Sequence, residues 1–469
     1  MRIGMQSLSG GCRLLVVVGL LGLLAAHSPL PAVHADDWPQ WLGPQRDGVW
    51  RETGILEKFP EKGPAVRWRT EIGIGYSGPA VAGGKVFVTD RVLDQGATNP
   101  ESGFSRNVVA GKDRVLCLDE ANGKIFWKYE YPSRYQVSYP AGPRTTPVVK
   151  DGKVYTLGTM GELLCLEIAT GKVVWERNFV KDYQAKVPGW GFSASPLLDG
   201  DRLICLVGCA GKVVVAFHKD TGMEIWHALS ASEPGYSPPV IYTIEGKRQL
   251  IIWHPDAING LDPETGKVYW TVPWKLRAGL SIPMPRQDGN RLFLTSFYNG
   301  PTMIEVKSDP LEAKILWKTT NWEGRQGNEM PDKTQALHSI MPTPIIQDGY
   351  IYGVCSYGEL RCLKEETGER VWMSLKATGN REKPVERWAN AFLVPQGDRC
   401  FLFNEKGDLI IARLTPKGYE EISRAHILEP TNNMAPGRLV LWSHPAFANK
   451  CMYARNDKEI VSVSLAAGQ

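Results

Sequence analysis

Residues 170–175 read TGKVVW, and closely similar phrases occur at several other places in the chain. In each phrase a turn containing glycine leads into a short β-rich run that ends at a tryptophan. The related copies are ANGKIFW ending at Trp127, DTGMEIW at Trp226, ETGKVYW at Trp270 and ETGERVW at Trp372. Self-similarity at a regular spacing predicts a repeat architecture, so the content of one unit decides the fold.

Each unit opens with a short apolar run that contains proline, followed by a glycine turn and a second apolar strand. TPVVKDGKVYTL from Thr146 and TPIIQDGYIYGV from Thr343 are clear cases, and eight such openings can be read along the chain. A third strand, such as LCLEI, precedes the phrase that ends at tryptophan. Four strands over about 50 residues are typical of a propeller blade. The sequence therefore predicts an all-β, eight-bladed β-propeller of four-stranded antiparallel blades, and it excludes helical solenoids.

The two ends of the repeat region are predicted to meet in one blade. Tryptophans from Trp68 to Trp372 recur at intervals of about 50 residues, and a last copy at this spacing would fall beyond residue 469. The run from Ala65 to Glu71, which holds Trp68, precedes the first complete unit. We expect this N-terminal strand to complete the last blade and remove an exposed sheet edge. Deletion of residues 36–71 should therefore be more damaging than deletion of residues 36–50.

The repeated tryptophans are predicted to be packing residues. The glycine of each turn can take a positive φ without steric cost, which closes the hairpin. The tryptophan then lies on the outermost strand, where it can bury one face against the next blade. A cofactor role fits poorly, because one ring cofactor cannot touch tryptophans around a whole circumference. The predicted blade-docking residues are Trp68, Trp127, Trp175, Trp226, Trp270, Trp317 and Trp372.

Residues 1–35 are predicted to be a cleaved signal peptide. Arg2 and Arg13 flank a polar start, the run from Leu14 to Ala26 is apolar, and residues 33–35 end in alanine. The alternative, an uncleaved membrane anchor, needs about 20 apolar residues, and this run is shorter. Asp36 rather than cysteine follows Ala35, so no lipid anchor is expected there. We expect an exported chain, periplasmic or secreted, that does not span a membrane after signal cleavage.

The charge balance gives no indication of a nucleic-acid partner. The chain has 54 basic and 50 acidic residues, a formal net charge of +4, and removal of the predicted signal lowers that charge further. Binding to nucleic acid or to an anionic membrane surface requires a stronger basic excess than this.

The cysteines are predicted to be structural. Cys117, Cys165 and Cys362 occupy the same place in three units, inside apolar strands. A cysteine in such a strand behaves as a small hydrophobic residue. No paired CxxC and no CxxCH haem-attachment motif occurs in the sequence, so burial is favoured over redox or zinc chemistry.

The phrase AxDxxTGKxxW, visible in LEIATGKVVW and LDPETGKVYW, resembles that of the pyrroloquinoline quinone (PQQ) repeat β-propellers. The resemblance covers residues 65 to 465 and implies eight four-stranded blades and an exported location. That family divides into calcium- and quinone-dependent alcohol dehydrogenases and non-enzymatic relatives, among them the propeller subunit of the outer-membrane protein assembly machinery. The repeat is strong evidence for fold and weak evidence for function, because one fold hosts unrelated activities.

The segment DDWPQWLGPQRDG, residues 36–48, resembles the leader found before exported propellers of this type. We expect residues 36–64 to form an N-terminal capping segment, with Trp38 and Trp41 covering one end of the core, and residues 65–469 to form the propeller.

Long loops are predicted to gather on one face of the propeller. The connection between consecutive blades lies on the same face as the turn between the second and third strands of a blade. Turns on the opposite face, such as AGGK and KDGK, are minimal. We call the first face the long-loop face and predict that function lies there, because loops on a rigid scaffold commonly carry binding sites. Its long loops are Val92–Asp113, Tyr131–Arg144, Lys181–Ser193, Asn321–Ser339, Ala377–Asn390 and Glu429–Ser443.

The candidate ligand-binding residues combine aromatic side chains with arginines, as recognition surfaces often do. The groups Arg387–Asn390 and Trp442–His444 each lie where a long loop enters an inner strand, so both should approach the central channel from one side. A polar ring or sugar with anionic or hydroxyl groups would suit them. Two alternatives remain, namely that these residues are an inert rim or that they plug the channel. The candidate set is Arg144, Trp190, His338, Arg387, Trp388, Asn390, Trp442 and His444.

The sequence favours a binding or scaffold protein, and an enzyme is the less favoured interpretation. The resemblance implies that a quinone dehydrogenase would hold calcium with hard oxygen ligands and, in many members, stack the quinone on a vicinal disulfide. Vicinal cysteines are missing here. Glu386 and Asn390 are candidate ligands, yet the stretch EKPVERWAN reads equally well as a charged loop that ends at an inner strand. We expect no cofactor or metal, a monomer, and an unknown protein, glycan or small-ligand partner. The alternative is a PQQ- and calcium-dependent alcohol or sugar dehydrogenase.

Overall fold

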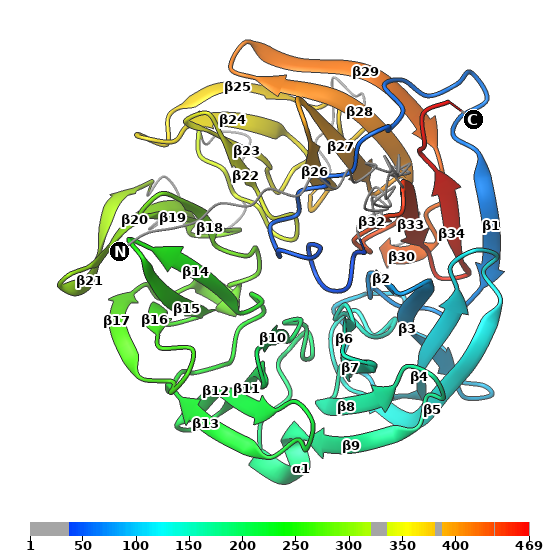
Figure 1. The fold of residues 1–469 in the computed structure, drawn as a ribbon, viewed down its shortest axis with the longest axis horizontal. Coiled ribbons are helices and arrows are strands. Elements are labelled where there is room, and N and C mark those ends of the chain that lie inside the picture. Colours follow the sequence, from blue (N-terminus) through cyan, green and yellow to red (C-terminus); the bar gives the residue numbers. More distant parts are fainter. Residues whose placement is uncertain (1–36, 320–334, 380–386, 436, 469) are drawn as a thin grey trace, which may run out of the picture. The chain divides into compact units, whose positions relative to one another are not determined.

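A computed structural model describes residues 37–319, 335–379, 387–435 and 437–468. Within these ranges the strands form eight four-stranded antiparallel sheets arranged in a ring (Figure 1). Helical structure in the same ranges is limited to α1 (Phe179–Tyr183) and a 3₁₀ turn (Arg277–Gly279). The predicted eight-bladed propeller is confirmed, whereas the predicted signal peptide lies outside the described residues.

The first four blades follow the chain from inner to outer strand. The first contains β2 (Ala80–Ala82), β3 (Lys85–Leu93), β4 (Val109–Asp119) and β5 (Ile125–Tyr135). The second contains β6 (Val148–Lys150), β7 (Lys153–Leu157), β8 (Glu162–Glu167) and β9 (Val173–Asn178). The third contains β10 (Leu197–Asp199), β11 (Arg202–Cys209), β12 (Lys212–His218) and β13 (Glu224–Ala228). The fourth contains β14 (Val240–Ile244), β15 (Lys247–His254), β16 (Ala257–Leu261) and β17 (Val268–Pro273).

The next three blades repeat this order. The fifth contains β18 (Arg286–Asp288), β19 (Arg291–Ser296), β20 (Gly300–Ser308) and β21 (Leu311–Lys318). The sixth contains β22 (Ile345–Gln347), β23 (Tyr350–Val354), β24 (Leu360–Lys364) and β25 (Arg370–Ser374). The seventh contains β26 (Ala391–Gln396), β27 (Arg399–Asn404), β28 (Asp408–Thr415) and β29 (Gly418–His426).

The eighth blade joins the two ends of the described chain. It contains β32 (Ala446–Ala448), β33 (Cys451–Arg455), β34 (Glu459–Ser464) and β1 (Val66–Glu71). The antiparallel register pairs Trp68 with Ser462 and Glu71 with Glu459. The predicted closing strand is therefore confirmed, and it covers the edge that β34 would otherwise expose.

The tryptophan of one blade packs on the turn glycine of the next blade. Trp175 in β9 donates from Nε1 to the carbonyl of Lys219 at 2.8 Å. Gly222 in the same turn has φ of +66°, and a Cβ there would lie 2.6 Å from the Trp175 ring. Trp127 and Gly171 have the same relationship one blade earlier. The repeated phrase thus holds both halves of one contact between blades.

The other predicted docking tryptophans lie in comparable places, with one difference. Trp68 and Trp317 also contact the turn glycine of the next blade and donate to its backbone. Trp226 contacts Gly266 of the next blade, and Trp372 donates to the carbonyl of Thr415. Trp270 instead donates to Gln249 Oε1 of its own blade, at 2.6 Å.

Residues 37–50 lie at the centre of the ring, inside the inner strands (Figure 1). Trp38 exchanges two backbone hydrogen bonds with Val81, and its side chain is 2% exposed. Arg46 is buried and donates to the carbonyls of Pro196 at 2.9 Å, Pro239 at 3.0 Å and Ser195 at 3.3 Å. The segment therefore ties several blades together from within.

The loops depart from their predicted extents in four places, and one of them is the loop Tyr131–Arg144, whose residues up to Tyr135 still belong to β5. β3 and β4 continue pairing as far as Leu93 and Gly111, so the irregular part of the first long loop is residues 94–108. Helix α1 begins the connection after β9, with Asn178 as its N-cap. The connection after β29 contains a hairpin of β30 (Asn432–Ala435) and β31 (Arg438–Val440). Sequence patterns do not distinguish these short local elements from loops.

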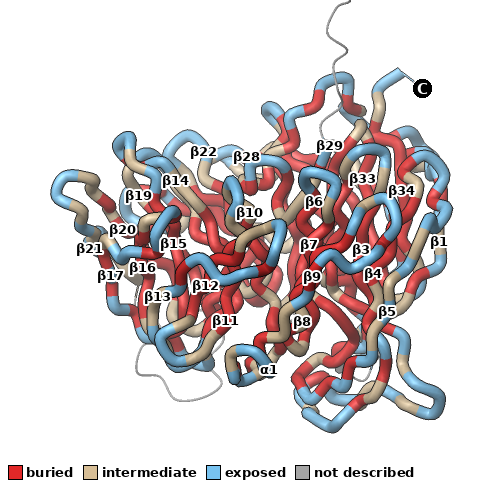
Figure 2. The backbone as a smooth tube through the Cα atoms, turned by 60° about the horizontal axis from the view of Figure 1, so that its bottom comes forward, coloured by how far each residue is buried: buried red, intermediate tan, exposed pale blue. Residues whose placement is uncertain are grey.

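Buried residues run through the inner strands of the blades, and exposed residues gather at turns and outer strands (Figure 2). All eight cysteines in the described ranges are free, and only Cys209 is not fully buried. In the part of the chain that the structure describes, no helix is long and apolar enough to cross a bilayer.

Candidate functional site

A cavity of about 450 Å³ lies on the axis of the propeller. Each blade contributes to it at least one residue that lies before or at the start of its inner strand. Taken once for each blade, these residues are Tyr76, Arg144, Ser195, Pro238, Ile282, Met341, Phe392 and His444. Trp41, from the segment inside the ring, also lines the cavity, and its ring lies 4.8 Å from that of His444. The N-terminal segment therefore contributes to the cavity wall together with the blades.

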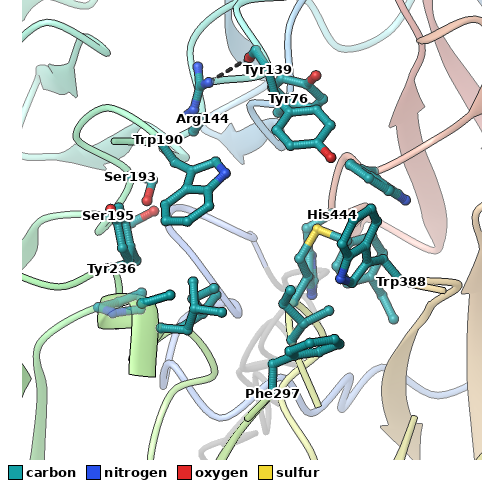
Figure 3. A pocket seen from close by; sticks show the side chains of 18 of the residues that line it. Tyr76, Tyr139, Arg144, Trp190, Ser193, Ser195, Tyr236, Phe297, Trp388 and His444 are labelled. Carbon is teal, nitrogen blue, oxygen red and sulfur yellow. Dashed lines mark hydrogen bonds between the residues drawn. The ribbon is translucent and has the colours of Figure 1, made fainter. Parts of the chain in front are cut away.

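The wall of the cavity is mainly aromatic (Figure 3). Ring pairs place Trp190 against Tyr236 at 5.8 Å and Tyr139 against Trp442 at 5.7 Å, measured between centroids. Phe104, from the loop between β3 and β4, lies 5.5 Å from Trp388 in the connection between the sixth and seventh blades. Flat apolar surfaces from distant loops thus surround one space, which suits a ligand that contains a ring.

Arg144 lines the cavity, but its terminal nitrogens are already hydrogen-bonded. Nη2 donates to the carbonyls of Ser138 at 2.9 Å and Tyr139 at 2.6 Å. Nη1 donates to the carbonyl of Gly142 and to Thr159 Oγ1 at 3.3 Å. The side chain therefore holds the loop before β6 in place, and what it can offer a ligand is mainly its positive charge.

Arg387 differs from Arg144 in the contacts of its guanidinium. The group lies over the ring of Trp388 at 4.6 Å and over that of Phe297 at 5.4 Å. Within the described ranges its guanidinium makes no hydrogen bond or ion pair, and the residue is exposed. A guanidinium supported by aromatic faces can still form a two-point contact with a carboxylate, sulfonate or phosphate.

His444 and His338 are both buried, but only His444 lines the cavity. Burial lowers the pKa of each imidazole to about 4. Nδ1 of His444 lies 2.6 Å from the carbonyl of Pro445, which requires a proton on Nδ1 and leaves Nε2 as an acceptor. His338 lies behind the wall, with Nδ1 at 2.9 Å from the carbonyl of Phe297. At neutral pH both rings are uncharged.

The structure brings six of the eight candidate residues to the cavity and leaves two outside it. Asn390 is buried beside the cavity and does not line it, and its side-chain amide has no hydrogen-bond partner among the described residues. His338 is the other exception. The six that line the cavity are Arg144, Trp190, Arg387, Trp388, Trp442 and His444.

Sequence reasoning missed Tyr76, Tyr236 and Trp41 as lining residues. A signal for the two tyrosines was present, because GYSGP from Gly75 and GYSPP from Gly235 repeat one phrase just before an inner strand. Trp41 was expected to cap the core, and nothing in its local sequence places it opposite His444.

The described lining residues do not fit a calcium-bound quinone. They include two arginines and no aspartate or glutamate, whereas calcium requires several oxygen ligands. Among the described residues no cluster of three His, Cys, Asp or Glu side chains could hold a metal. Glu386, considered as a ligand from the sequence, lies outside the described residues.

Comparison with solved structures finds the same fold at low sequence identity. BamB from Moraxella catarrhalis is 14% identical with a TM-score of 0.52, covering 86% of this chain and 99% of that one. A quinohemoprotein alcohol dehydrogenase from Comamonas testosteroni is 13% identical with a TM-score of 0.59, covering 92% and 81%. The computationally designed Ika8 protein is 10% identical with a TM-score of 0.51, covering 85% and 99%. These likenesses establish the fold alone.

Comparison with curated protein sequences found no match. The family model described as outer membrane protein assembly factor BamB matches residues 111–374 and 254–469, which together make up more than half of the chain. The match covers blades from the first to the eighth. The protein therefore belongs to the BamB family of PQQ-like repeat β-propellers.

Proposed function

We propose that this protein is an exported binding protein whose axial cavity takes a small organic anion that contains a ring. The ring of the ligand would lie between the aromatic walls, and its anionic group would meet the guanidinium of Arg387. Export is supported by the signal-like residues 1–35 and by the outer-membrane description of the family.

The observation that carries this proposal is the contrast between the two arginines at the cavity. Arg144 has its terminal N–H groups bonded to backbone and hydroxyl acceptors, whereas Arg387 has aromatic support and no anion among the described residues. An exposed cation beside apolar rings supplies both orientation and affinity, since aromatic and arginine side chains dominate binding energy at many sites.

The alternative proposal, a PQQ- and calcium-dependent dehydrogenase, has less support. The described cavity wall offers no carboxylate for the metal or for a general base, and the likeness to the quinohemoprotein alcohol dehydrogenase concerns fold alone. We therefore derive no chemical step through a quinone.

A partner protein on the long-loop face is a second candidate. The family description concerns assembly of outer membrane proteins, and several apolar side chains on the loops of this face are exposed. Phe104 is 51% exposed, Val108 51% and Leu439 52%. A pull-down with the tagged chain, compared with a Val108→Ser/Leu439→Ser double variant, tests this surface separately from the cavity, because neither residue lines it.

The test of ligand binding uses 8-anilinonaphthalene-1-sulfonate, a fluorescent probe with aromatic rings and one anionic group. The full chain is expressed with its N-terminal segment, and mass spectrometry of the purified product reports whether residues 1–35 are removed. Saturable binding is expected, and Arg387→Ala should weaken it about 10- to 100-fold, as loss of a charge-assisted contact predicts.

Arg134→Ala is the matched control, because Arg134 is an exposed arginine on β5 that does not line the cavity. Equal affinity in the Arg387→Ala and Arg134→Ala variants would contradict the proposal. PQQ with calcium chloride forms a separate arm of the experiment. Binding of PQQ that requires calcium would favour the dehydrogenase instead.

A further inference from the structure

Glu405 lies behind the cavity wall, in the turn between β27 and β28, and its side chain is 2% exposed. Its two carboxylate oxygens have different partners. Oε2 accepts a hydrogen bond from Trp442 Nε1 at 3.0 Å, and Oε1 accepts one from Arg438 Nη2 at 2.8 Å. Glu405 does not itself line the cavity, whereas Trp442 does. The carboxylate therefore sits one contact away from a prospective ligand.

Arg438 extends the connection to the other side of the site. It lies in β31, and its Nη1 donates to the backbone carbonyl of Arg387. The backbone of Glu405 adds two more links, donating to the carbonyl of Asn390 at 3.1 Å and accepting from the amide of Leu441 at 2.9 Å. One residue thus ties together the loop before β26, the turn after β27 and the hairpin connection that carries Trp442.

We propose that Glu405 is a positioning residue for the ligand site, setting the ring plane of Trp442 and the backbone of Arg387 through a single buried carboxylate. This inference rests on the proposed function, because both positioned residues are the ones assigned to the ligand. An ionised carboxylate suits this role, since its oxygens can hold two donors in different directions. Charge-assisted hydrogen bonds are also the strongest and shortest of the side-chain contacts.

The simpler alternative is that Glu405 only neutralises Arg438 within the core. A buried ion pair contributes little net stability compared with apolar side chains of similar volume, so stability alone does not explain it. The hydrogen bond from Trp442 favours a positioning role, because a neutral indole ring needs no counter-charge. Its bond to Glu405 fixes the orientation of a ring that stands 5.7 Å from Tyr139 across the cavity wall.

The experiment measures probe affinity and melting temperature for Glu405→Gln, Arg438→Met and the double variant. We expect Glu405→Gln to weaken binding of 8-anilinonaphthalene-1-sulfonate about tenfold, as loss of fixed orientation in two contact residues predicts. The double variant should bind the probe about as weakly as whichever single variant has the lower affinity, because the effects of residues in one network do not add.

Asp90→Asn is the matched control. Asp90 is a buried carboxylate that pairs with Arg114 at 2.6 Å, and neither residue lines the cavity. The Asp90→Asn variant should have a lower melting temperature but a probe affinity within about twofold of that of the unmodified protein. A role for Glu405 in stability alone would give this same pattern.

An indole NMR signal reports positioning directly. In protein labelled with ¹⁵N-tryptophan, the Trp442 signal is assigned by its loss in Trp442→Phe. It should move when the probe binds, and in Glu405→Gln it should already be displaced in the free protein. An unchanged Trp442 signal in Glu405→Gln would overturn the inference.

The outcomes separate this inference from the proposed function. If the unmodified protein does not bind the probe, or Arg387→Ala binds it equally well, the proposed function fails. If Arg387→Ala binds weakly but folded Glu405→Gln binds like the unmodified protein, only the positioning role fails. Should Glu405→Gln not fold, Glu405→Asp replaces it, because the shorter carboxylate can keep Arg438 but not both partners. Unchanged affinity in that variant also overturns the inference.

Discussion

The indole ring of Trp175 lies directly against Gly222 of the next blade, so closely that a Cβ on Gly222 would stand 2.6 Å from the ring. The same turn receives the indole N–H at the carbonyl of Lys219. Two parts of the repeated phrase, separated by about one unit of sequence, therefore form one interface. This relationship explains why the glycine and the tryptophan recur together.

Gly222→Ala should destabilise the protein by about 2–4 kcal/mol, combining the cost of a positive φ with a steric clash against the Trp175 ring. Gly152→Ala is the control, because Gly152 also has a positive φ but a Cβ on it would meet no other atom within 4 Å. In that variant the free energy of unfolding should fall by only about 1–2 kcal/mol. Urea unfolding measures both, and equal losses would refute the close contact.

Trp175→Ala should lower the free energy of unfolding by about 3–5 kcal/mol, because it removes a large ring buried between blades. Trp175→Phe keeps most of the apolar surface and loses the hydrogen bond to Lys219, so about 1–2 kcal/mol is expected. Thermal and urea unfolding test both variants. A stable Trp175→Ala protein would show that the ring does not hold the blades together.

Arg46→Met should lower the free energy of unfolding by about 2–4 kcal/mol, since it leaves three buried carbonyls without their hydrogen-bond donor. Arg51→Met is the control within the same segment, because Arg51 pairs with Asp47 at the surface and such pairs contribute about 0–1 kcal/mol. Urea unfolding again provides the comparison, and similar losses in the two variants would contradict a stabilising role for the buried arginine.

The burial of residues in the segment 37–50 changes the expected effect of N-terminal deletions on stability. The sequence alone predicted that deletion of residues 36–50 would be milder than deletion of 36–71. Trp38, Trp50 and Arg46 are all buried, so we now expect both deletions to reduce stability strongly. Melting curves of the two truncated chains test this, and a near-normal melting temperature without residues 36–50 would favour the original expectation.

His444 should make stability depend on pH between about 4 and 6.5. Burial lowers its pKa to about 4, whereas an unfolded histidine has a pKa near 6.5. The unfolded chain therefore binds more protons in this window. The contribution of the neutral ring is fully present above pH 6.5 and is lost as pH falls towards 4, by up to about 3 kcal/mol.

The measurement is the difference in unfolding free energy between the original protein and His444→Phe at pH 7.5, 5.5 and 4.5. A difference is needed because burial raises the pKa of Asp113 to about 6 and that of Glu162 to about 7, which acts in the opposite direction. His227→Gln, at an exposed histidine, is the control. A difference that stays constant with pH would contradict the assignment.

The sequence by itself determined the propeller, the number of blades and the closing strand. These features follow from local signals that repeat, namely a glycine that permits a hairpin turn and a tryptophan one strand later. Because each blade contacts mainly its neighbours, local patterns were enough to specify the ring. Arg387, Trp388, Trp442 and His444 line the same cavity, as their places at the entries to two inner strands predicted, and their role in binding stays a prediction.

Only the tertiary structure decided what the axial cavity is. Trp41 lines it from a segment that precedes every blade opening in the sequence, and the position of that segment depends on the carbonyls of Pro196 and Pro239, which accept hydrogen bonds from Arg46. Arg144 and Arg387 are alike in sequence terms, yet Arg144 is bonded to its own loop, whereas among the described residues the guanidinium of Arg387 contacts aromatic rings and no acceptor. Whether a side chain is available to a ligand depends on hydrogen-bond and packing partners that are remote in sequence, and a local sequence pattern does not predict these partners.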